Sequence, residues 1–596
     1  MAISKGKKIV FILGGVIIVL VLFVVGILVL SLLIIREPEI DRNSVLVLKI
    51  KDELPDYVPE DPLLKVLGIE QKPSFVSLLQ QLRKAKVDKR IGAVLLDIDF
   101  PGISLGKADE LREAVAEFKS SGKPVYAFME IGTNKEYYIA TAADKIFVPP
   151  TGDLYINGLQ AQASFYRGSL DKLGIEPEVI QIGKYKNAPD AYTRKDMSEA
   201  QREVVNALLD DFYGRIVGAI AETRKKTPDE VKAIIDNAPY NAVQAKQQNL
   251  IDGAIYRDDV YNELKKTLDY KESEDLKVTT ASKYRDIKPE SLGLNTGERI
   301  AVIFASGGIM TGSSNDGSFG GAQTAGSDTL VKAINDAAED SSIKAIVLRV
   351  DSPGGSALAS DLIWHAIENA KTKKPVVTSM GDVAASGGYY IAANSNKIVA
   401  EPSTVTGSIG VFLGKPNVKG LYDWLGISSE TISRGKNAGI FDVTRNWTPE
   451  ERAVFENQAK NIYYDNFVPK VAAGRGKPAE YIDSIGQGRV WTGMQAKEKG
   501  LIDEFGGLNK AVEIAKQLAN LPADKDVKRV VFPTPKPFLQ ELFGSDDEAT
   551  VQAKQREALM QALPEDARRL FRYAALFDAM KRGETMALMP FELNIK

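Results

Sequence analysis

A long run of apolar residues stands at the start of the chain. From 9 to 35 none of the 27 residues is charged, and Val, Leu and Ile predominate. About 20 apolar residues are enough for a helix to cross a bilayer, so we predict a transmembrane anchor at 9–35. Three lysines precede it within 1–8, whereas the flank after Ile35 carries both signs. This asymmetry places residues 1–8 in the cytoplasm and the rest of the chain outside it.

A cleaved signal peptide is the alternative to a retained anchor. The apolar region of a signal peptide has about 7–15 residues and ends in small residues. This run is longer and ends in the sequence SLLII at 31–35. We therefore expect the anchor to be retained.

After the anchor, the chain contains the same pattern twice. Residues 93–102 (AVLLDIDFPG) return as 345–354 (AIVLRVDSPG), and 137–140 (YYIA) returns as 389–392, both at an offset of 252. So long a period indicates a duplicated domain, because solenoid repeats have only about 20–50 residues. The predicted units are an N-terminal domain at 43–268, a linker at 269–296, a C-terminal domain at 297–530 and a tail at 531–596.

Each copy alternates short β-branched runs with helical patterns. In the second copy, a strand pattern at 345–350 is followed by a glycine turn, a helical pattern around 362–367 and another strand pattern at 376–379. This alternation predicts an α/β fold with buried strands. Between Val204 and Ile220 an apolar stripe of helical period predicts a long helix that faces a core or a partner subunit.

Composition restricts the chemistry. The 596 residues include no Cys and a single His, which excludes thiol catalysis, disulfides and a zinc site with several histidines. The 76 Lys and Arg residues are balanced by 79 Asp and Glu residues, so no basic excess favours nucleic acid as a partner. Hydrolytic chemistry would have to use Ser, Thr, Lys, Asp or Glu, and we expect neither a metal nor a cofactor.

One serine distinguishes the second copy from the first. Ser386 lies among the small residues of 384–388 (AASGG), which allow a backbone and a substrate to approach it. Its counterpart in the first copy is Asn134 or Lys135, and there the glycine turn matching 352–355 (SPGG) has lost its second glycine. Two glycine turns, one of them beside a serine, suit an oxyanion hole made of backbone N–H groups. Only the second copy retains both.

The first copy retains a lysine that the second has lost. Residues 183–186 (GKYK) align with 435–438 (GKNA), so Lys186 corresponds to an alanine. Such mirrored loss is expected if one composite site takes Ser386 from one copy and Lys186 from the other. A nucleophilic serine needs a base, and burial can lower the pKa of a lysine by up to ~3–5 units. We therefore predict a desolvated Lys186 beside Ser386.

Other residues offer alternative chemistry. His365 could act as the base of Ser386, although a packed or surface histidine on a helix is the simpler interpretation. Lys184 is the competing lysine, and Asp99 and Asp351 at equivalent strand ends could form an aspartic dyad, although capping roles are commoner there. Two other functions stay open: a non-catalytic oligomeric membrane scaffold and a crotonase-like acyl-CoA enzyme.

The motifs, taken in their order along the chain, resemble a known family. The anchor, GKYK in the first copy, and SPGG, AASGGYY and TGSIG in the second are similar to the long form of bacterial signal peptide peptidase A, also called protease IV. The resemblance extends to about Ala519. It implies two tandem Clp-protease/crotonase-like domains and assembly into homo-oligomers, namely tetramers. It also implies a single-pass protein of the bacterial inner membrane with periplasmic catalytic domains. It also implies cleavage of remnant signal peptides and other apolar peptides.

The resemblance further implies a role for each matching residue. Ser386 would be the nucleophile and Lys186 the general base of a Ser-Lys dyad. Gly355 and Gly387 would donate the oxyanion N–H groups, and Ser408 would orient the lysine amine. These assignments describe a serine endopeptidase without metal or cofactor.

Overall fold

The computed structural model describes residues 37–58, 73–315, 323–533 and 585–589. The anchor predicted at 9–35 lies outside these ranges. Within them, no helix combines the length and the apolar character needed to cross a membrane.

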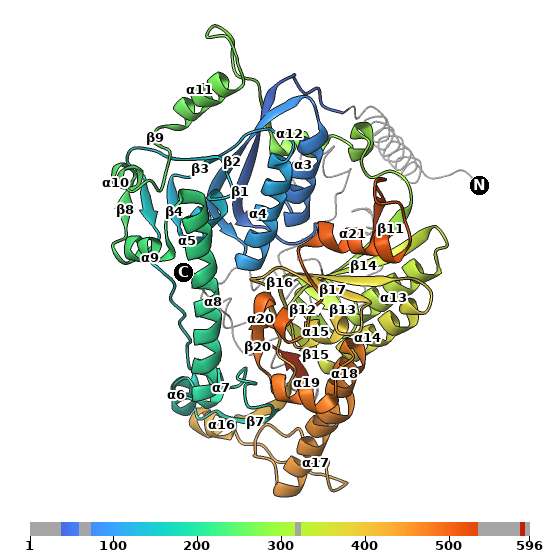
Figure 1. Ribbon diagram of the computed structural model, residues 1–596. Helices are drawn as coiled ribbons and strands as arrows, with labels where there is room; N and C mark the ends of the chain where they lie inside the picture. The colour runs from blue at the N-terminus through green and yellow to red at the C-terminus, as the bar shows by residue number, and fades with distance from the viewer. Residues whose placement is uncertain (1–36, 59–72, 316–322, 534–584, 590–596) are drawn as a thin grey trace, which may run out of the picture.

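The first copy is built on a parallel sheet of six strands in the order β10-β1-β2-β3-β5-β9 (Figure 1). Its strands are rich in Val, Ile and Leu, as expected where helices cover both faces of a parallel sheet. The strand bounds are β1 (Ser44–Glu53), β2 (Ile91–Gly102), β3 (Val125–Phe128), β5 (Lys145–Val148), β9 (Gly253–Ala254) and β10 (Val278–Thr280). Three short strands form a separate sheet: β4 (Ile131–Thr133), β6 (Asp153–Tyr155) and β8 (Tyr240–Asn241).

The second copy repeats this topology. Its parallel strands pair in the order β22-β11-β14-β16-β17-β21. The C-terminal end of β16 also pairs with β18, which in turn pairs with β20. The same strand order in both copies confirms the α/β prediction and agrees with the duplication. The strand bounds are β11 (Arg299–Ser306), β14 (Ile343–Ser352), β16 (Val376–Ala385), β17 (Lys397–Ala400), β18 (Val405–Gly407), β20 (Val490–Thr492), β21 (Glu504–Phe505) and β22 (Lys528–Phe532).

Helices cover the sheets of both copies. Those of the first copy are α3 (Phe75–Val87), α4 (Leu105–Lys119), α5 (Asn134–Ala140), α6 (Arg167–Lys172), α7 (Asp190–Thr193), α8 (Glu199–Arg224), α9 (Pro228–Asp236), α10 (Ala242–Gln247), α11 (Arg257–Thr267) and α12 (Ala281–Arg285), with a 3₁₀ turn at Pro289–Leu292. Those of the second are α13 (Ser327–Glu339), α14 (Ala357–Lys371), α15 (Gly387–Ala392), α16 (Lys419–Leu425), α17 (Pro449–Lys460), α18 (Val468–Arg475), α19 (Ala479–Ile485), α20 (Gly493–Glu498) and α21 (Leu508–Leu518), with a π-helical segment at Asn461–Phe467.

Helix α8 is the long helix that the apolar stripe predicted. Ser198 caps its start by accepting a hydrogen bond from the N–H of Gln201, which satisfies a backbone donor that a helix leaves free. Its buried stripe, from Val204 to Ile220, joins the core of the first copy. The N-terminal part of the helix lies beside the second copy (Figure 1), where Gln495 of α20 donates to the carbonyl of Ala207.

The segment at 269–296, predicted as a linker, is partly structured. It contains β10, whose Val278 pairs in parallel with Val45 of β1 at the edge of the first sheet. It also contains α12, whose Tyr284 is completely buried. The stretch therefore packs as part of the first copy, because its few apolar residues complete that core despite a polar composition.

A third sheet joins the two copies. Its strand order is β13-β12-β15-β23-β19-β7. Strand β7 (Glu176–Ile182) comes from the first copy and pairs antiparallel with β19 (Val411–Asn417) of the second, so that Ile182 lies opposite Val411. The remaining strands are β12 (Gly308–Met310), β13 (Thr324–Gly326), β15 (Gly354–Ser356) and β23 (Met586–Leu588).

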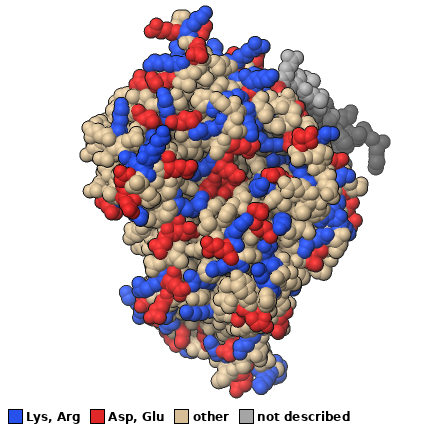
Figure 2. Space-filling model, in the orientation of Figure 1, with Lys and Arg blue, Asp and Glu red and all other residues tan. Residues whose placement is uncertain are grey.

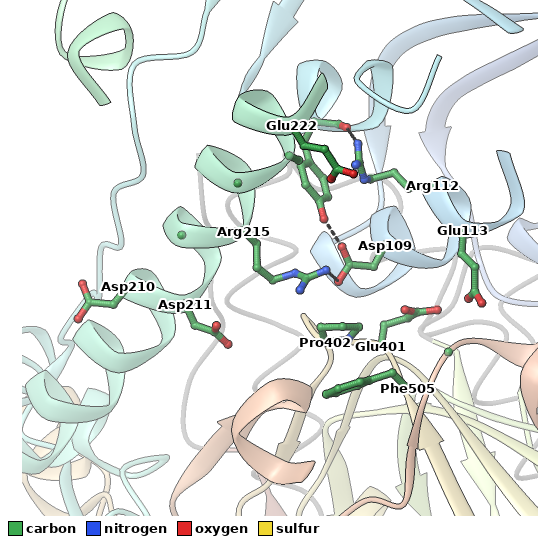
Figure 3. A pocket seen from close by; sticks show the side chains of 15 residues that line it. Asp109, Arg112, Glu113, Asp210, Asp211, Arg215, Glu222, Glu401, Pro402 and Phe505 are labelled. Carbon is green, nitrogen blue, oxygen red and sulfur yellow. Dashed lines mark hydrogen bonds and ion pairs between the residues drawn. The ribbon is translucent and has the colours of Figure 1, made fainter. Parts of the chain in front are cut away.

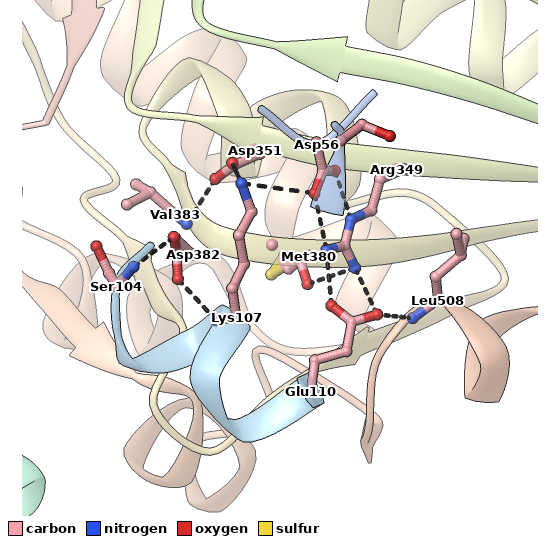
Figure 4. Close-up of polar contacts among 12 residues, drawn as sticks. Asp56, Ser104, Lys107, Glu110, Arg349, Asp351, Met380, Asp382, Val383 and Leu508 are labelled. Carbon is pink, nitrogen blue, oxygen red and sulfur yellow. Dashed lines mark hydrogen bonds and ion pairs between the residues drawn. The ribbon is translucent and has the colours of Figure 1, made fainter. Parts of the chain in front are cut away.

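A buried ionic cluster also connects the copies (Figure 4). Arg349 of β14 is completely buried, and its Nε lies 2.7 Å from Asp56 Oδ2 while its Nη2 lies 2.7 Å from Glu110 Oε2. Both carboxylates belong to the first copy. Nearby, Lys107 Nζ lies 2.7 Å from Asp351 Oδ2. Burial alone would raise the pKa of Asp56, but the positive charges of Arg349 and Lys107 hold this pKa below its ordinary value.

The charged surface is mixed in sign. On the face shown in Figure 2, Lys and Arg side chains are interspersed with Asp and Glu, and the described residues form no continuous basic surface there. This distribution agrees with the net charge of −3.

Candidate active site

Ser386 occupies a sharp turn between a strand and a helix. Strand β16 ends at Ala385 and α15 begins at Gly387, and Ser386 between them has φ 55° and ψ −113°. A backbone in this region costs about 1–3 kcal/mol for a residue with a side chain. The N–H of Ser386 donates to the carbonyl of Gly407 at 2.8 Å, which helps to hold the turn.

Lys186 lies directly beside this serine. Its Nζ is 2.7 Å from Ser386 Oγ, and it also donates to Ser408 Oγ at 2.9 Å and to the Ser408 carbonyl at 3.1 Å. All three residues are completely buried. Burial lowers the pKa of Lys186 well below its ordinary value, because a charged amine loses its hydration there. The structure thus brings together the serine and the lysine that the two copies had retained separately.

Strand pairing between the copies explains this meeting. Ile182, the last residue of β7, lies opposite Val411, the first residue of β19. Lys186 follows β7 in the chain and Ser408 precedes β19, so the pairing brings these two residues together. The loop at 486–489 closes over the lysine. A Cβ on Gly488 would lie 2.5 Å from the Lys186 backbone nitrogen, and Gly488 has φ 78°. Gly488 was not among the predicted site residues, because its importance depends on Lys186, which lies about 300 residues away in the sequence.

Gly355 and Gly387 lie at two converging turns. A Cβ on Gly387 would be 3.1 Å from the Gly355 nitrogen, and a Cβ on Gly354 would be 2.7 Å from the Gly387 nitrogen. Gly354 has φ 101° and Gly355 has φ 159°. Only glycine allows these two backbones to approach each other so closely. Paired N–H groups at such a point can stabilise a developing oxyanion.

The corresponding place in the first copy holds side chains instead. Asn134 begins α5, and its Nδ2 donates to the carbonyl of Gly158 at 2.9 Å. Lys135 Nζ donates to the carbonyl of Pro101 at 2.6 Å and so connects the two turns. Neither residue is a nucleophile comparable to Ser386, which agrees with a degenerate first site.

The alternative candidates lie elsewhere. His365 is exposed on α14 and contacts Asn369, as a surface helix histidine would. Lys184 is exposed in the loop after β7. Asp99 is exposed, whereas Asp351 pairs with a lysine in the ionic cluster. The two aspartates therefore do not form a dyad.

A cavity of about 640 Å³ lies apart from the serine and the lysine (Figure 3). It is lined by charged residues of α4 and α8 and by the second copy's Glu401, Pro402 and Phe505. Burial and neighbouring carboxylates raise the pKa of Glu401 well above its ordinary value. Among the described residues, no group of three or more His, Cys, Asp or Glu side chains could hold a metal ion.

The space beside the glycine turns is occupied by strand β23. Its Ala587 lies opposite Gly355 of β15, and its Met586 lies opposite Phe412 of β19. No role was predicted for the tail, because a strand of three residues has too little periodicity to be recognised in a sequence.

Comparisons with known proteins agree on one family. The sequence profile of peptidase family S49 matches residues 117–271 and 368–522, which together make up just over half of the chain and lie one in each copy of the internal repeat. The chain is similar to "Serine protease SPPA, chloroplastic" of Arabidopsis thaliana, at 38% identity over 84% of this chain and 73% of that protein. It is also similar to "Protease 4" of Salmonella typhi, at 36% identity over 76% of this chain and 73% of that protein.

A further relative and one solved structure are also similar to this chain. "Protease 4" of Haemophilus influenzae is 31% identical over 79% of this chain and 77% of that protein. Among solved structures, a membrane-bound stomatin-specific protease aligns with 40% of this chain and 100% of that chain, at 17% identity and a TM-score of 0.25. The Clp-protease/crotonase-like fold of the two copies stays a prediction.

Proposed function

This chain belongs to peptidase family S49 and is a serine peptidase with tandem domains; on that basis, we propose that it is a membrane-anchored endopeptidase in which a Ser386–Lys186 dyad degrades remnant signal peptides and other apolar peptides. The observation that carries the dyad is the 2.7 Å contact between Lys186 Nζ and Ser386 Oγ in a completely buried site. The predicted family resemblance is confirmed.

The geometry supports a general-base mechanism. Neutral Lys186 takes the hydroxyl proton as Ser386 Oγ bonds to the substrate carbonyl carbon. The N–H groups of Gly355 and Gly387 stabilise the oxyanion of the tetrahedral intermediate. The lysine then protonates the leaving amine as the peptide C–N bond breaks. Water, deprotonated in turn by Lys186, hydrolyses the acyl-enzyme ester and restores the serine.

Ser408 orients the side-chain amine of Lys186. A neutral amine has two N–H groups and one lone pair. The hydroxyl and the carbonyl of Ser408 are both placed to accept from Lys186 Nζ, which leaves the lone pair for Ser386. Ser408 is therefore a positioning residue, and Lys186 is the base.

The substrate class is supported by the surroundings of the dyad. Phe412 forms a small apolar cluster with Met586 of β23, and Met310 packs against it. Strands at such a place can bind an extended peptide through main-chain hydrogen bonds while neighbouring pockets take its side chains. The predicted anchor at 9–35 would hold the site near the membrane in which remnant signal peptides are released.

The proposal includes the bacterial inner membrane as the location, with the catalytic domains on the periplasmic side, and a homotetramer as the assembly. The apolar run at 9–35 and its lysine-rich flank support the location. The assembly rests on the motif resemblance alone.

Hydrolysis of a fluorogenic apolar peptide tests the proposed function. Full-length chain should be found in the membrane fraction, and after solubilisation in detergent it should cleave the apolar peptide faster than a charged peptide of the same length. An acyl-CoA thioester serves as the second substrate. Turnover of the thioester alone would favour the crotonase-like alternative, and absence of both activities together with absence of labelling by a serine-reactive probe would favour the scaffold.

The rate should depend on pH through Lys186. Because burial lowers the pKa of this lysine, kcat/KM should rise as the pH increases through that lowered pKa and then level off while the amine stays neutral. The inflection should lie well below the ordinary lysine value of about 10.4. A pH profile of kcat/KM with a peptide ester measures it. An inflection near the ordinary value would mean that the base is a hydrated lysine.

Ser408→Ala should slow catalysis without unfolding the protein. Loss of one of the two acceptors that hold the amine should lower kcat by roughly 10-fold to 100-fold, less than the roughly 10²-fold to 10⁴-fold that a general base itself contributes, because the base is still present. The matched control is Ser403→Ala, since Ser403 is a buried serine whose hydroxyl has no hydrogen bond among the described residues. Equal kcat values for both variants would remove the positioning role from Ser408.

A further inference from the structure

The loop at 486–489 in the second copy, which we call the closing loop, is bound on both sides to the segments that form the dyad. The N–H of Tyr185, the residue before the catalytic lysine, donates to the Gln487 carbonyl at 2.7 Å. The N–H of Ser408 donates to the Arg489 carbonyl at 2.7 Å. The closing loop therefore connects the segment that carries the base with the segment that orients it.

The side chain of Arg489 fastens the closing loop to helix α8 of the first copy. Its Nη1 forms an ion pair with Glu203 Oε1, and Glu203 Oε2 accepts a hydrogen bond from the Tyr185 hydroxyl at 3.0 Å. The guanidinium carbon lies 4.9 Å from the ring centroid of Tyr185 and 4.3 Å from that of Trp491. A planar guanidinium suits such a place, because it can stack on aromatic faces while it binds a carboxylate.

These fastening groups lie near the surface, whereas the amine beneath them is buried. The side chain of Glu203 is 48% exposed and that of Arg489 is 15% exposed, while Lys186 has no exposed surface. The hydrogen bond from Arg489 lowers the pKa of Glu203, so this carboxylate is ionised at neutral pH. The other charged or titratable side chains around the closing loop and the lysine segment are Lys184, Asp190, Tyr463, Asp483 and Lys499.

The backbone of the closing loop needs to be held in place. Gln487 has φ 50°, a region that few residues with a side chain adopt. The neighbouring Gly488 lies against the backbone of Lys186. If the ion pair to α8 were lost, we expect this strained turn to relax away from the lysine.

We propose that Arg489 is a positioning residue which, by binding Glu203, keeps the closing loop over Lys186 and so excludes water from the amine. This inference rests on the proposed function, because it concerns the same dyad. Water that reached the amine would stabilise its charged form. A protonated lysine cannot take the proton of Ser386. A surface contact between the two copies would thus control how reactive the buried base is.

The pH profile of kcat/KM tests the inference in Arg489→Met and Glu203→Ala, with the full-length chain in detergent and a peptide ester as substrate. Each variant should lower kcat/KM at pH 7 by roughly 10-fold, the scale of one lost hydrogen bond to a charged group. Each should regain most of this loss at a pH high enough to neutralise the lysine. Asp210→Ala is the matched control, because Asp210 is an exposed carboxylate about two turns further along α8, and its profile should match the wild type.

Glu203→Ala also separates the closing loop from a direct electrostatic effect. Loss of a negative charge alone would favour the neutral amine and would move the inflection to lower pH, whereas entry of water moves it to higher pH. An inflection that stays in place or moves to lower pH in Glu203→Ala would overturn the inference. A loss of rate that is the same at every pH would also overturn it, since the basicity of the lysine would then be unchanged.

Hydrogen exchange followed by mass spectrometry provides a readout that does not depend on activity. Backbone amides at 183–189 and 486–491 should exchange faster in Arg489→Met and Glu203→Ala than in the wild type or Asp210→Ala. Unchanged exchange in both variants would overturn the inference and leave the peptidase assignment intact. Absence of ester turnover in the wild type would instead count against the proposed function, and the exchange rates would still show whether Arg489 holds the loop.

Discussion

Replacement of Lys186 with methionine is expected to lower kcat for peptide hydrolysis by roughly 10⁴-fold or more, the loss typical when one member of a catalytic nucleophile–base unit is removed. Methionine has a similar length and no basic nitrogen, so Ser386 loses its proton acceptor. The fold should be retained, because within the part of the chain that the structure describes the buried amine contacts serine oxygens and no carboxylate, so its removal leaves no unpaired charge. Steady-state hydrolysis of the fluorogenic apolar peptide measures the effect.

Ser386→Ala should be as damaging as Lys186→Met, and the double variant should be no worse than either. Two residues that act as one unit give effects that are far from additive. Lys184→Met is the matched control, since Lys184 is an exposed lysine two positions away, and its kcat should stay within about twofold of the wild type. Loss of activity in Lys184→Met with full activity in Lys186→Met would reverse the choice of base.

Arg349→Met is expected to reduce the free energy of unfolding by about 3–5 kcal/mol, the range for removal of one partner from a buried ion pair. The guanidinium contacts Asp56 and Glu110 in a site without solvent exposure. Methionine would remove the guanidinium from two buried carboxylates, and Lys107, 3.6 Å from Asp56, would still neutralise part of that charge. Because these carboxylates belong to the first copy and Arg349 to the second, the loss should also weaken the contact between the copies. Denaturant unfolding followed by circular dichroism measures the change.

An exposed ion pair provides the control for Arg349. Lys332 and Asp336 form such a pair on α13, and Lys332→Met should change stability by less than about 1 kcal/mol. If Arg349→Met were no more destabilising than Lys332→Met, the buried cluster would not hold the copies together. In the wild type, the lowered pKa of Asp56 means that its contribution is complete above the ordinary Asp value of 3.8 and is lost as the pH falls through the lowered pKa.

Several features of the site could be predicted because they depend on short stretches of sequence. Glycines at 352–355 and 387–388 indicate tight turns, since these positions need a backbone without Cβ atoms. The mirrored loss of a serine and a lysine between the copies indicated a composite site before any distance was known. The repeat itself was visible because both copies retain their buried strand patterns.

Other features depend on contacts between distant segments. The segment at 269–296 has a linker-like composition, yet β10 within it completes the edge of the first sheet. Gly488 resembles any other loop glycine until the backbone of Lys186 is seen to lie against it. Strand β23 has only three residues, and its significance comes entirely from its position between β15 and β19.

The duplicated α/β architecture and the candidate nucleophile and base could be predicted from the amino-acid sequence, and so could the exclusion of cysteine chemistry, because residue type, periodicity and an internal repeat are visible in the chain itself. The folded structure was needed to show that Lys186 and Ser386 meet within one chain, that an ionic cluster connects the copies and that β23 lies in the site. These outcomes require strand pairing and burial between segments 200 or more residues apart, and such long-range pairings leave no trace in any short stretch of sequence.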